Sequence, residues 1–142
     1  MTYNELWHRL VPLYEPEEAR AVVRELLDEL FGMSLTDIVS GKVSELSAED
    51  QRLLEEKMQR LQRGEPVQYV TGMAYFAGRL FRVGPSVLIP RPETAQLCEI
   101  VRQDYDRPYC ALQPPEKIRV LDIGTGSGCI AISLALDMPR AN

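Results

Sequence analysis

Three alternating glycines behind an aspartate form the most distinctive stretch of the chain, "LDIGTGSGCIA" at residues 121–131. Glycines in such a turn let a ligand approach the backbone closely, which suits a nucleotide or nucleoside. A phosphate-binding loop would need Lys followed by Ser or Thr after the last glycine, but Cys129 and Ile130 stand there. A dinucleotide fingerprint, G-x-G-x-x-G/A, is satisfied from Gly126 to Ala131, although this pattern is permissive.

The same stretch fills every position of D-x-G-x-G-x-G, the S-adenosylmethionine loop of class I methyltransferases. Asp122 can pair with the α-ammonium group of the donor, a charge-assisted hydrogen bond worth about 1.5–3 kcal/mol. Backbone N–H groups at the start of the next helix would face the polar end of the ligand. The loop therefore favours the methyl donor over a dinucleotide, and a ligand-free turn is the remaining alternative. The predicted cofactor-binding residues are Asp122, Gly124, Thr125, Gly126, Ser127 and Gly128.

A strand and a helix must hold this loop. The run "IRVLDI" at residues 118–123 is nearly continuously apolar and predicts a strand covered on both faces, and "SGCIAISLAL" predicts the following helix. One strand and one helix cannot make a doubly wound sheet. We therefore expect order up to about residue 90, no parallel neighbour for residues 118–123 within the chain, and disorder or packing on a partner after about residue 110.

The first part of the chain is helical by periodicity and by its caps. Thr2 and Glu5 fit a capping box, and Pro16 suits the first turn of a second helix that Gly32 ends. A short helix over residues 35–39 and a longer one from Ser47 to Gly64 follow. Together these helices predict a small bundle. One face of the second helix carries Ala19, Val22, Val23, Leu26, Leu27 and Leu30, and the longer helix carries Leu53, Leu54, Met58 and Leu61, so the helices can bury a small common core.

The pattern changes after Gly64. Alternating aromatic and β-branched residues predict a β-hairpin over about residues 74–89. The segment "PRPET" then places Pro92 in the first turn of another helix, and "DRPYCALQPPEK" is a proline-rich connector.

Charge and composition exclude several classes of function. Residues 1–66 carry 8 Lys/Arg and 14 Asp/Glu, a balance of 8 − 14 = −6, which argues against binding to nucleic-acid phosphates and is compatible with a basic protein partner. The 3 cysteines are widely spaced and there is 1 histidine, so neither a disulfide framework nor a metal site is predicted. Without a signal peptide or a long apolar run, no membrane contact and a cytoplasmic location are expected.

Four segments, "GEPVQYVTG", F-x-x-x-x-F, "VLIPRPET" and "VLDIGTGSGCIAISLA", occur in the order and spacing of a known family. From about residue 64 to residue 136 the chain resembles the HemK-type (PrmC-like) release factor glutamine methyltransferases. The segment "LIPRPET" is far more discriminating than the glycine loop. Residues 1–63 resemble the family mainly in length and helical character.

The resemblance implies an α+β chain: a helical substrate-docking domain at 1–72, a β-hairpin linker at 73–90, and at 91–142 the first βα unit of a truncated, Rossmann-like class I methyltransferase domain. It implies methyl transfer from S-adenosylmethionine to the glutamine side-chain amide nitrogen in the Gly-Gly-Gln motif of class 1 peptide-chain release factors. It also implies that the substrate and cofactor pocket is lined by Pro90, Arg91, Pro92, Glu93 and Thr94.

The chain departs from the family in three respects. Ala95 stands where the family usually has an acidic residue, no "NPPY" catalytic motif occurs, and the acidic residue that would hold the cofactor ribose after the second strand is missing. No catalytic residue is therefore predicted, and we expect this front portion of a longer enzyme to be inactive alone. Two alternatives remain open: a related NPPY-type methyltransferase acting on another protein or on a nucleic-acid base, and a non-catalytic helical interaction module.

Overall fold

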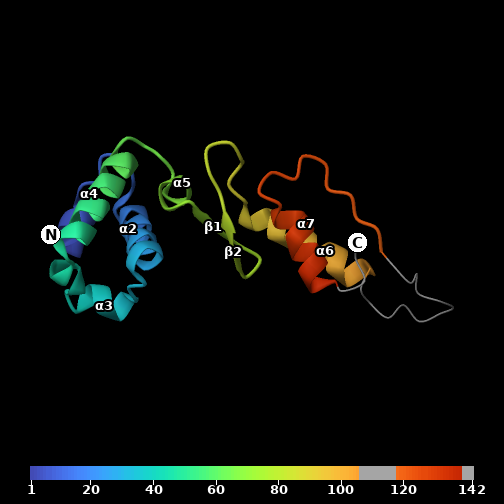
Figure 1. The fold of residues 1–142 in the computed structure, drawn as a ribbon, viewed down its shortest axis with the longest axis horizontal. Coiled ribbons are helices and arrows are strands. Elements are labelled where there is room, and N and C mark those ends of the chain that lie inside the picture. The colour runs from blue at the N-terminus through green and yellow to red at the C-terminus, as the bar shows by residue number, and fades with distance from the viewer. Residues whose placement is uncertain (106–117, 139–142) are drawn as a thin grey trace. The chain divides into compact units, whose positions relative to one another are not determined.

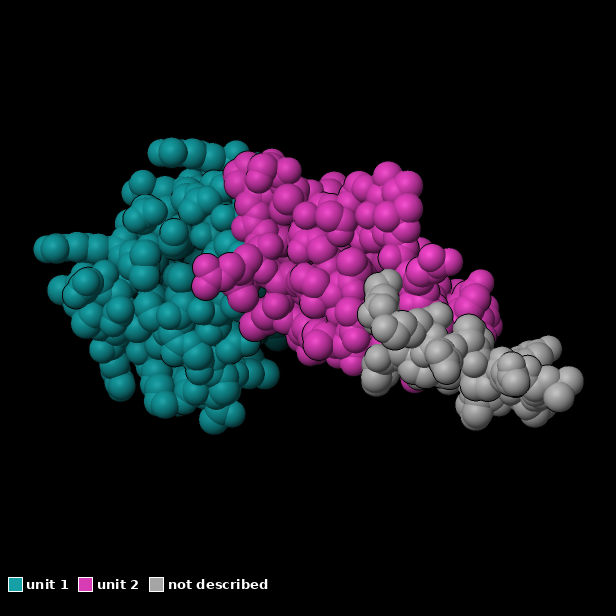
Figure 2. Space-filling view, turned by 45° about the vertical axis from the view of Figure 1, so that its right-hand side comes forward, with its two compact units in different colours: residues 1–72 teal, residues 73–142 magenta. Residues whose placement is uncertain are grey.

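The computed structural model describes residues 1–105 and 118–138 of the 142-residue chain. The chain divides into two compact units, residues 1–72 and residues 73–142 (Figure 2). The predicted α+β class is consistent with what is described, which is mostly helical with one two-stranded antiparallel sheet. None of the described helices has the length and apolar character needed to cross a membrane.

The first unit is helical throughout, as the sequence predicts, and its boundaries lie at the predicted caps. Thr2 and Glu5 form the capping box, with Glu5 N–H donating to Thr2 Oγ1 at 3.3 Å and Thr2 N–H donating to Glu5 Oε2 at 2.8 Å. Gly32 ends the second helix in the left-handed conformation, with φ of 63°. The elements of this unit are α1 (Tyr3–His8), α2 (Pro16–Phe31), α3 (Leu35–Val39), the 3-10 helix η1 (Lys42–Glu45), α4 (Ala48–Gln62) and α5 (Val67–Thr71).

One apolar core holds these helices together. The face predicted for α2 is buried, except that Leu30 is only partly covered. Of the four apolar residues predicted along α4, three are buried and Leu53 is exposed. The reason is helical geometry, because Leu54, Met58 and Leu61 share a face at i, i+4 and i+7, and Leu53 lies about 100° away from Leu54. The core also includes Leu6, Trp7, Leu10, Ile38, Val43, Val67 and Val70.

Two arginines tie the helices of the first unit to one another. The Arg9 guanidinium, just after α1, donates to both carboxylate oxygens of Glu55 on α4, each at 2.8 Å. The Arg60 guanidinium at the end of α4 donates to both Glu65 oxygens and to the carbonyls of Tyr69, at 3.1 Å, and Val70, at 3.4 Å. Arg60 therefore anchors the turn after α4 and the helix α5 that follows it.

The second unit consists of a hairpin and two helices. Strand β1 (Met73–Phe76) pairs with β2 (Arg79–Arg82), and the helices are α6 (Pro92–Tyr105) and α7 (Cys129–Asp137) (Figure 1). The hairpin turns through Ala77 and Gly78, both with positive φ, as a tight two-residue turn between right-twisted strands requires.

The core of this unit joins the hairpin to both helices. Phe76 and Phe81 meet edge to face at 6.0 Å between ring centroids, and they cluster with Cys98 of α6 and with Cys129 and Leu134 of α7. Figure 1 shows α6 and α7 lying side by side, which agrees with their direct contacts.

An ion pair also links the hairpin to the end of α7. Arg79 donates to both carboxylate oxygens of Asp137, at 2.5 and 3.3 Å. The hairpin thus contacts α7 through both an apolar face and this ion pair.

Two predictions for this unit are corrected. The hairpin ends at Arg82 rather than near residue 89, because Gly84 and Pro85 follow and Pro85 has no N–H to donate to a ladder. The predicted strand at residues 118–123 is not formed beyond a bridge at its first residue, and Leu121 and Ile123 are 83% and 86% exposed. An extended segment becomes a strand only by pairing, and the hairpin is the only sheet in the described residues.

The prediction of order up to about residue 90 agrees with the structure, which describes that whole stretch. The predicted proline-rich connector and Cys110 lie outside the described residues. The prediction of disorder or packing on a partner after about residue 110 is wrong for α7, because its apolar residues Cys129 and Leu134 are buried against α6 and the hairpin of the same chain. The helix predicted after the glycine loop is confirmed as α7.

The Arg60 anchor predicts a pH-dependent stability for the first unit. Arg60→Met should lower the free energy of unfolding at pH 7 by roughly 1–2 kcal/mol, since charged hydrogen bonds are lost from a half-buried site. Hydrogen bonds from Arg60 hold the pKa of Glu65 below its usual value of 4.5, so this stabilisation is present above pH 4.5 and is lost as the pH falls through the depressed value. The difference between the two proteins should therefore narrow in acid.

Urea unfolding followed by fluorescence measures this effect, because Trp7 is the single tryptophan and is buried in the first unit. Arg63→Met is the matched control, since Arg63 is exposed and lies three residues further along. Equal stability of the Arg60 and Arg63 variants at pH 7 would contradict the role of the anchor.

Candidate functional site

The glycine loop and the "PRPET" segment meet at one pocket of the second unit, with a volume of about 190 Å³. The loop precedes α7 and the segment "VLIPRPET" leads into α6, so the pocket lies where the N-terminal ends of the two packed helices come together. The residues that line it are Leu88, Ile89, Pro90, Arg91, Thr94, Gly124, Thr125, Gly126, Ser127, Cys129 and Ile130.

The backbone of the loop takes a conformation that favours glycine. Gly124, Gly126 and Gly128 have φ of 76°, 58° and 79°, in the left-handed region. At Gly128 a Cβ atom would also lie 3.0 Å from Ile132 Cδ1 of the next helical turn. The three alternating glycines are therefore required by the path of the loop.

The aspartate before the loop is oriented by the loop itself. Thr125 Oγ1 donates a hydrogen bond of 2.9 Å to Asp122 Oδ2, and the backbone N–H of Gly128 donates to the Thr125 carbonyl at 2.9 Å. Thr125 lines the pocket, so the Asp122 carboxylate is held next to it. One oxygen, Oδ1, accepts no hydrogen bond within the described residues. It can accept a hydrogen bond from a cationic group of a ligand.

The start of α7 provides donors rather than acceptors. Its N-cap, Gly128, has no side chain to cap the helix, and the first turn contains no acidic residue. Free N–H groups and the positive end of the helix dipole therefore remain at this end. Ser127 Oγ is shielded from solvent and has no hydrogen-bond partner among the described residues. The polar end of a nucleoside cofactor such as S-adenosylmethionine fits this arrangement. It could accept hydrogen bonds from the Ser127 hydroxyl and from the free N–H groups of α7, and the glycines let it approach the backbone closely.

The structure places some of the predicted site residues at this pocket and not others. Pro90, Arg91, Thr94, Gly124, Thr125, Gly126 and Ser127 line it. Asp122, Pro92, Glu93 and Gly128 are not among the lining residues, and Pro92 and Glu93 are exposed at the start of α6.

Sequence reasoning missed the apolar wall, which consists of Leu88, Ile89, Cys129 and Ile130. The signal was available in the sequence, because these residues directly flank the predicted polar ones.

The two cysteines of this unit that the structure describes are shielded from solvent. Cys98 and Cys129 are buried free thiols. Burial raises the pKa of the Cys98 thiol, with further contributions from Cys129, Asp137 and Asp122. A buried thiol with a raised pKa is a poor nucleophile. In the described parts of the chain, no three residues of the His, Cys, Asp or Glu types gather in a way that could hold a metal ion.

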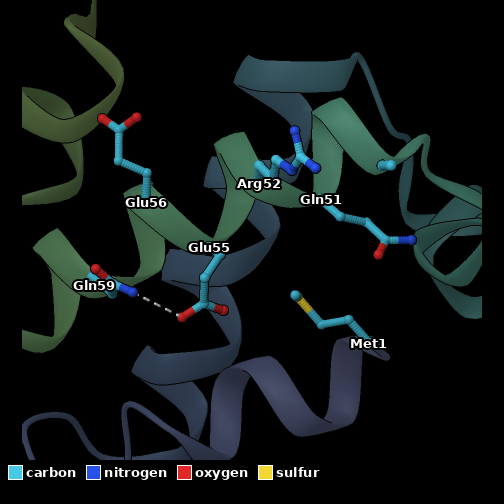
Figure 3. Close-up of a pocket in the computed structure, with 7 residues that line it drawn as sticks. Met1, Gln51, Arg52, Glu55, Glu56 and Gln59 are labelled. Carbon is cyan, nitrogen blue, oxygen red and sulfur yellow. Dashed lines mark hydrogen bonds between the residues drawn. The ribbon is translucent and has the colours of Figure 1, made fainter.

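A second hollow, of about 520 Å³, lies on the first unit along α4 (Figure 3). It is lined by Met1, Ala48, Gln51, Arg52, Glu55, Glu56 and Gln59. Its carboxylates are already partnered, since Glu55 accepts from Arg9 and from Gln59 at 3.3 Å and Glu56 pairs with Lys57 at 3.7 Å. The hollow offers a polar surface but no unpartnered carboxylate.

A family model and individual relatives both relate this chain to one group of proteins. A protein-family model described as the PrmC N-terminal domain matches residues 8–72. A release factor glutamine methyltransferase from Bacteroides thetaiotaomicron is 47% identical over 132 residues, which are 93% of this chain and 44% of that protein.

Two further relatives carry the same name. The protein from Koribacter versatilis is 50% identical over 97 residues, or 68% of this chain and 32% of the relative. The protein from Neisseria gonorrhoeae is 37% identical over 141 residues, or 99% of this chain and 46% of the relative. The chain thus spans less than half the length of these curated relatives.

The geometry of the loop predicts the effect of one added methyl group. Gly128→Ala should weaken the start of α7 by roughly 1–2 kcal/mol, because alanine disfavours positive φ and its Cβ would crowd Ile132. Backbone amides of α7 should then exchange with deuterium about 5–30 times faster, as measured by mass spectrometry.

Gly84→Ala provides the control, since its added Cβ would meet no atom within 4 Å and its φ lies outside the left-handed region. Unchanged protection of α7 in the Gly128 variant would show that the loop tolerates a side chain there.

Proposed function

Since the chain is a PrmC-like N-terminal portion, related over most of its length to release factor glutamine methyltransferases, we propose that the complete protein has this activity. It transfers a methyl group from S-adenosylmethionine to the side-chain amide nitrogen of the glutamine in the Gly-Gly-Gln motif of class 1 release factors. The observation that carries the proposal is the pocket, in which two segments distant in sequence, residues 88–94 and residues 124–130, meet.

The residues of this pocket have distinct tasks in the proposed reaction. When bound, S-adenosylmethionine supplies an electrophilic methyl group on a sulfonium. Asp122 accepts hydrogen bonds from its ammonium group, and the N-terminal N–H groups of α7 face its polar end. The apolar side chains of Leu88, Ile89 and Ile130 line one wall and provide an apolar surface for the donor.

The methyl acceptor, the glutamine amide nitrogen, is the less reactive partner in this transfer. An amide nitrogen is a weak nucleophile, because its lone pair is delocalised into the carbonyl, so the enzyme must hold it in line with the methyl–sulfonium bond. No residue lining the described pocket is an acidic acceptor for the amide hydrogens. We assign that task to the "NPPY" motif of the family, which this sequence does not contain, and we expect residues 1–142 alone to be inactive.

The two units take different roles in this proposal. Residues 1–72 dock the protein substrate, residues 73–90 link the units, and residues 91–142 begin a Rossmann-like methyltransferase domain. The acidic balance of −6 over residues 1–66 (8 − 14) supports a basic protein partner over nucleic acid. A substrate of the translation machinery implies action in the cytoplasm.

Incubation of the complete protein with isotope-labelled donor and a class 1 release factor tests this function. Label on the Gly-Gly-Gln glutamine, located by mass spectrometry, is the expected result. Label on another protein or on a nucleic-acid base would replace the proposed substrate, and absence of any transfer would favour a helical interaction module.

Removal of the loop carboxylate tests the cofactor site separately. In the complete protein, Asp122→Ala should weaken binding of S-adenosylmethionine by roughly 10–100-fold, because one charge-assisted hydrogen bond is lost. Isothermal titration calorimetry measures the affinity directly. Asp104→Ala on the exposed end of α6 is the control, and an Asp122 variant that binds as tightly as the control would remove this role.

A further inference from the structure

A groove on the first unit lies where α5 packs against α2, with a volume of about 480 Å³. Two of its lining residues, Val22 of α2 and Val67 of α5, belong to the apolar core of the unit. Ala21 and Pro66 add exposed apolar surface, and Tyr14, just before α2, adds an aromatic ring. The groove therefore offers an apolar surface to another molecule, on a different unit from the glycine loop.

Two carboxylates line the same groove. Glu18 and Glu25 are seven residues apart on α2, which places them on one face of the helix and about 10 Å apart along its axis. No Lys or Arg is among the residues that line the groove. By contrast, Arg52 lines the hollow along α4, and Arg24 lines a further hollow of about 400 Å³ beside α3. The groove thus combines apolar surface with negative charge that its own lining does not neutralise.

The surroundings of Glu25 show that its charge is uncompensated. Gln68 Nε2 donates to Glu25 Oε1 at 3.4 Å, a long hydrogen bond from an uncharged group. Burial raises the pKa of Glu25 and the like charge of Glu29 raises it further, so both causes disfavour the ionised carboxylate. A positive group that enters the groove would relieve this destabilisation by supplying a counter-ion.

Beside Glu18 the groove combines a carboxylate with an aromatic ring. Burial raises the pKa of Tyr14 and the charge of Glu18 raises it further, so the two side chains lie close to each other. An arginine side chain suits this pair, because its planar guanidinium stacks on aromatic rings and bonds carboxylates bidentately. The apolar surface of Ala21 and Val22 can cover the aliphatic stem of such a side chain.

We propose that the groove between α2 and α5 docks a basic, arginine-bearing segment of the protein substrate, with Glu18 and Glu25 binding its cationic side chains. The inference rests on the proposed function, because it takes a class 1 release factor as that substrate. Charge complementarity selects this occupant. A neutral apolar segment would leave both carboxylates desolvated without partners, and an acidic segment would be repelled.

Removal of the two charges tests the docking. In the complete protein, Glu18→Gln combined with Glu25→Gln should weaken binding of a purified class 1 release factor roughly 5–30-fold at low salt, since two charge-assisted contacts are lost. The difference should shrink as salt is added, because salt screens exposed charges. Ala21→Lys places a cation in the groove and should weaken binding as well. Isothermal titration calorimetry measures each affinity without turnover.

A second pair of carboxylates provides the matched control. Glu45 and Glu49 are exposed on the same unit and do not line the groove, so Glu45→Gln combined with Glu49→Gln removes the same net charge elsewhere. This control should keep the affinity of the wild-type protein within roughly twofold, since it alters only long-range attraction. Urea unfolding followed by Trp7 fluorescence should show that all variants are folded.

The outcomes separate this inference from the proposed function. Equal affinities of the groove variant and the control variant, or wild-type affinity of Ala21→Lys, would overturn the docking site, while methylation of the Gly-Gly-Gln glutamine by the wild-type protein would still support the function. A wild-type dimer that the groove variant dissociates, as measured by sedimentation, would assign the groove to a second copy of the protein and overturn the inference too. Neither binding nor methylation by the wild-type protein would overturn the proposed function, and the docking site with it.

Discussion

Packing between α6 and α7 is the constraint on which the candidate site depends. The two helices share an apolar core in which Cys98 of one and Leu134 of the other are buried, and the hairpin covers it through Phe76 and Phe81. Because the helices are held together, the segments that lead into them are also brought together. Cys129 belongs both to this core and to the pocket lining, so the burial that joins the helices also forms one wall of the pocket.

Electrostatics then determines what such a pocket can bind. Most arginines that the structure places between elements are neutralised: Arg9 by Glu55, Arg60 by Glu65 and Arg79 by Asp137. These pairs fix the architecture of each unit. Ser127 differs because the described chain offers its buried hydroxyl no partner, and an unsatisfied polar group beside a cavity is expected where a ligand completes the hydrogen bond.

In the first unit, local interactions set the ends of the helices and tertiary contacts hold the helices together. Its helix boundaries follow capping residues such as Thr2 and Ser34, whose side chains satisfy nearby backbone donors. Its assembly depends on a core from six helical segments and on the Arg60 anchor. This unit has the match to the PrmC N-terminal domain and carries the acidic balance of the chain.

The sequence by itself determined the helices, their caps and the left-handed glycines of the loop, since these depend on residues within a few positions of one another. Only the tertiary structure showed which segments pair and which residues far apart in the sequence come together. The apolar run at 118–123 reads as a strand, but Leu121 and Ile123 stay exposed, because a strand exists only when another segment accepts its backbone hydrogen bonds. In the same way, the sequence named Arg91 and Ser127, and only the folded unit showed that they share one pocket and that the Ser127 hydroxyl lacks a partner within the described residues.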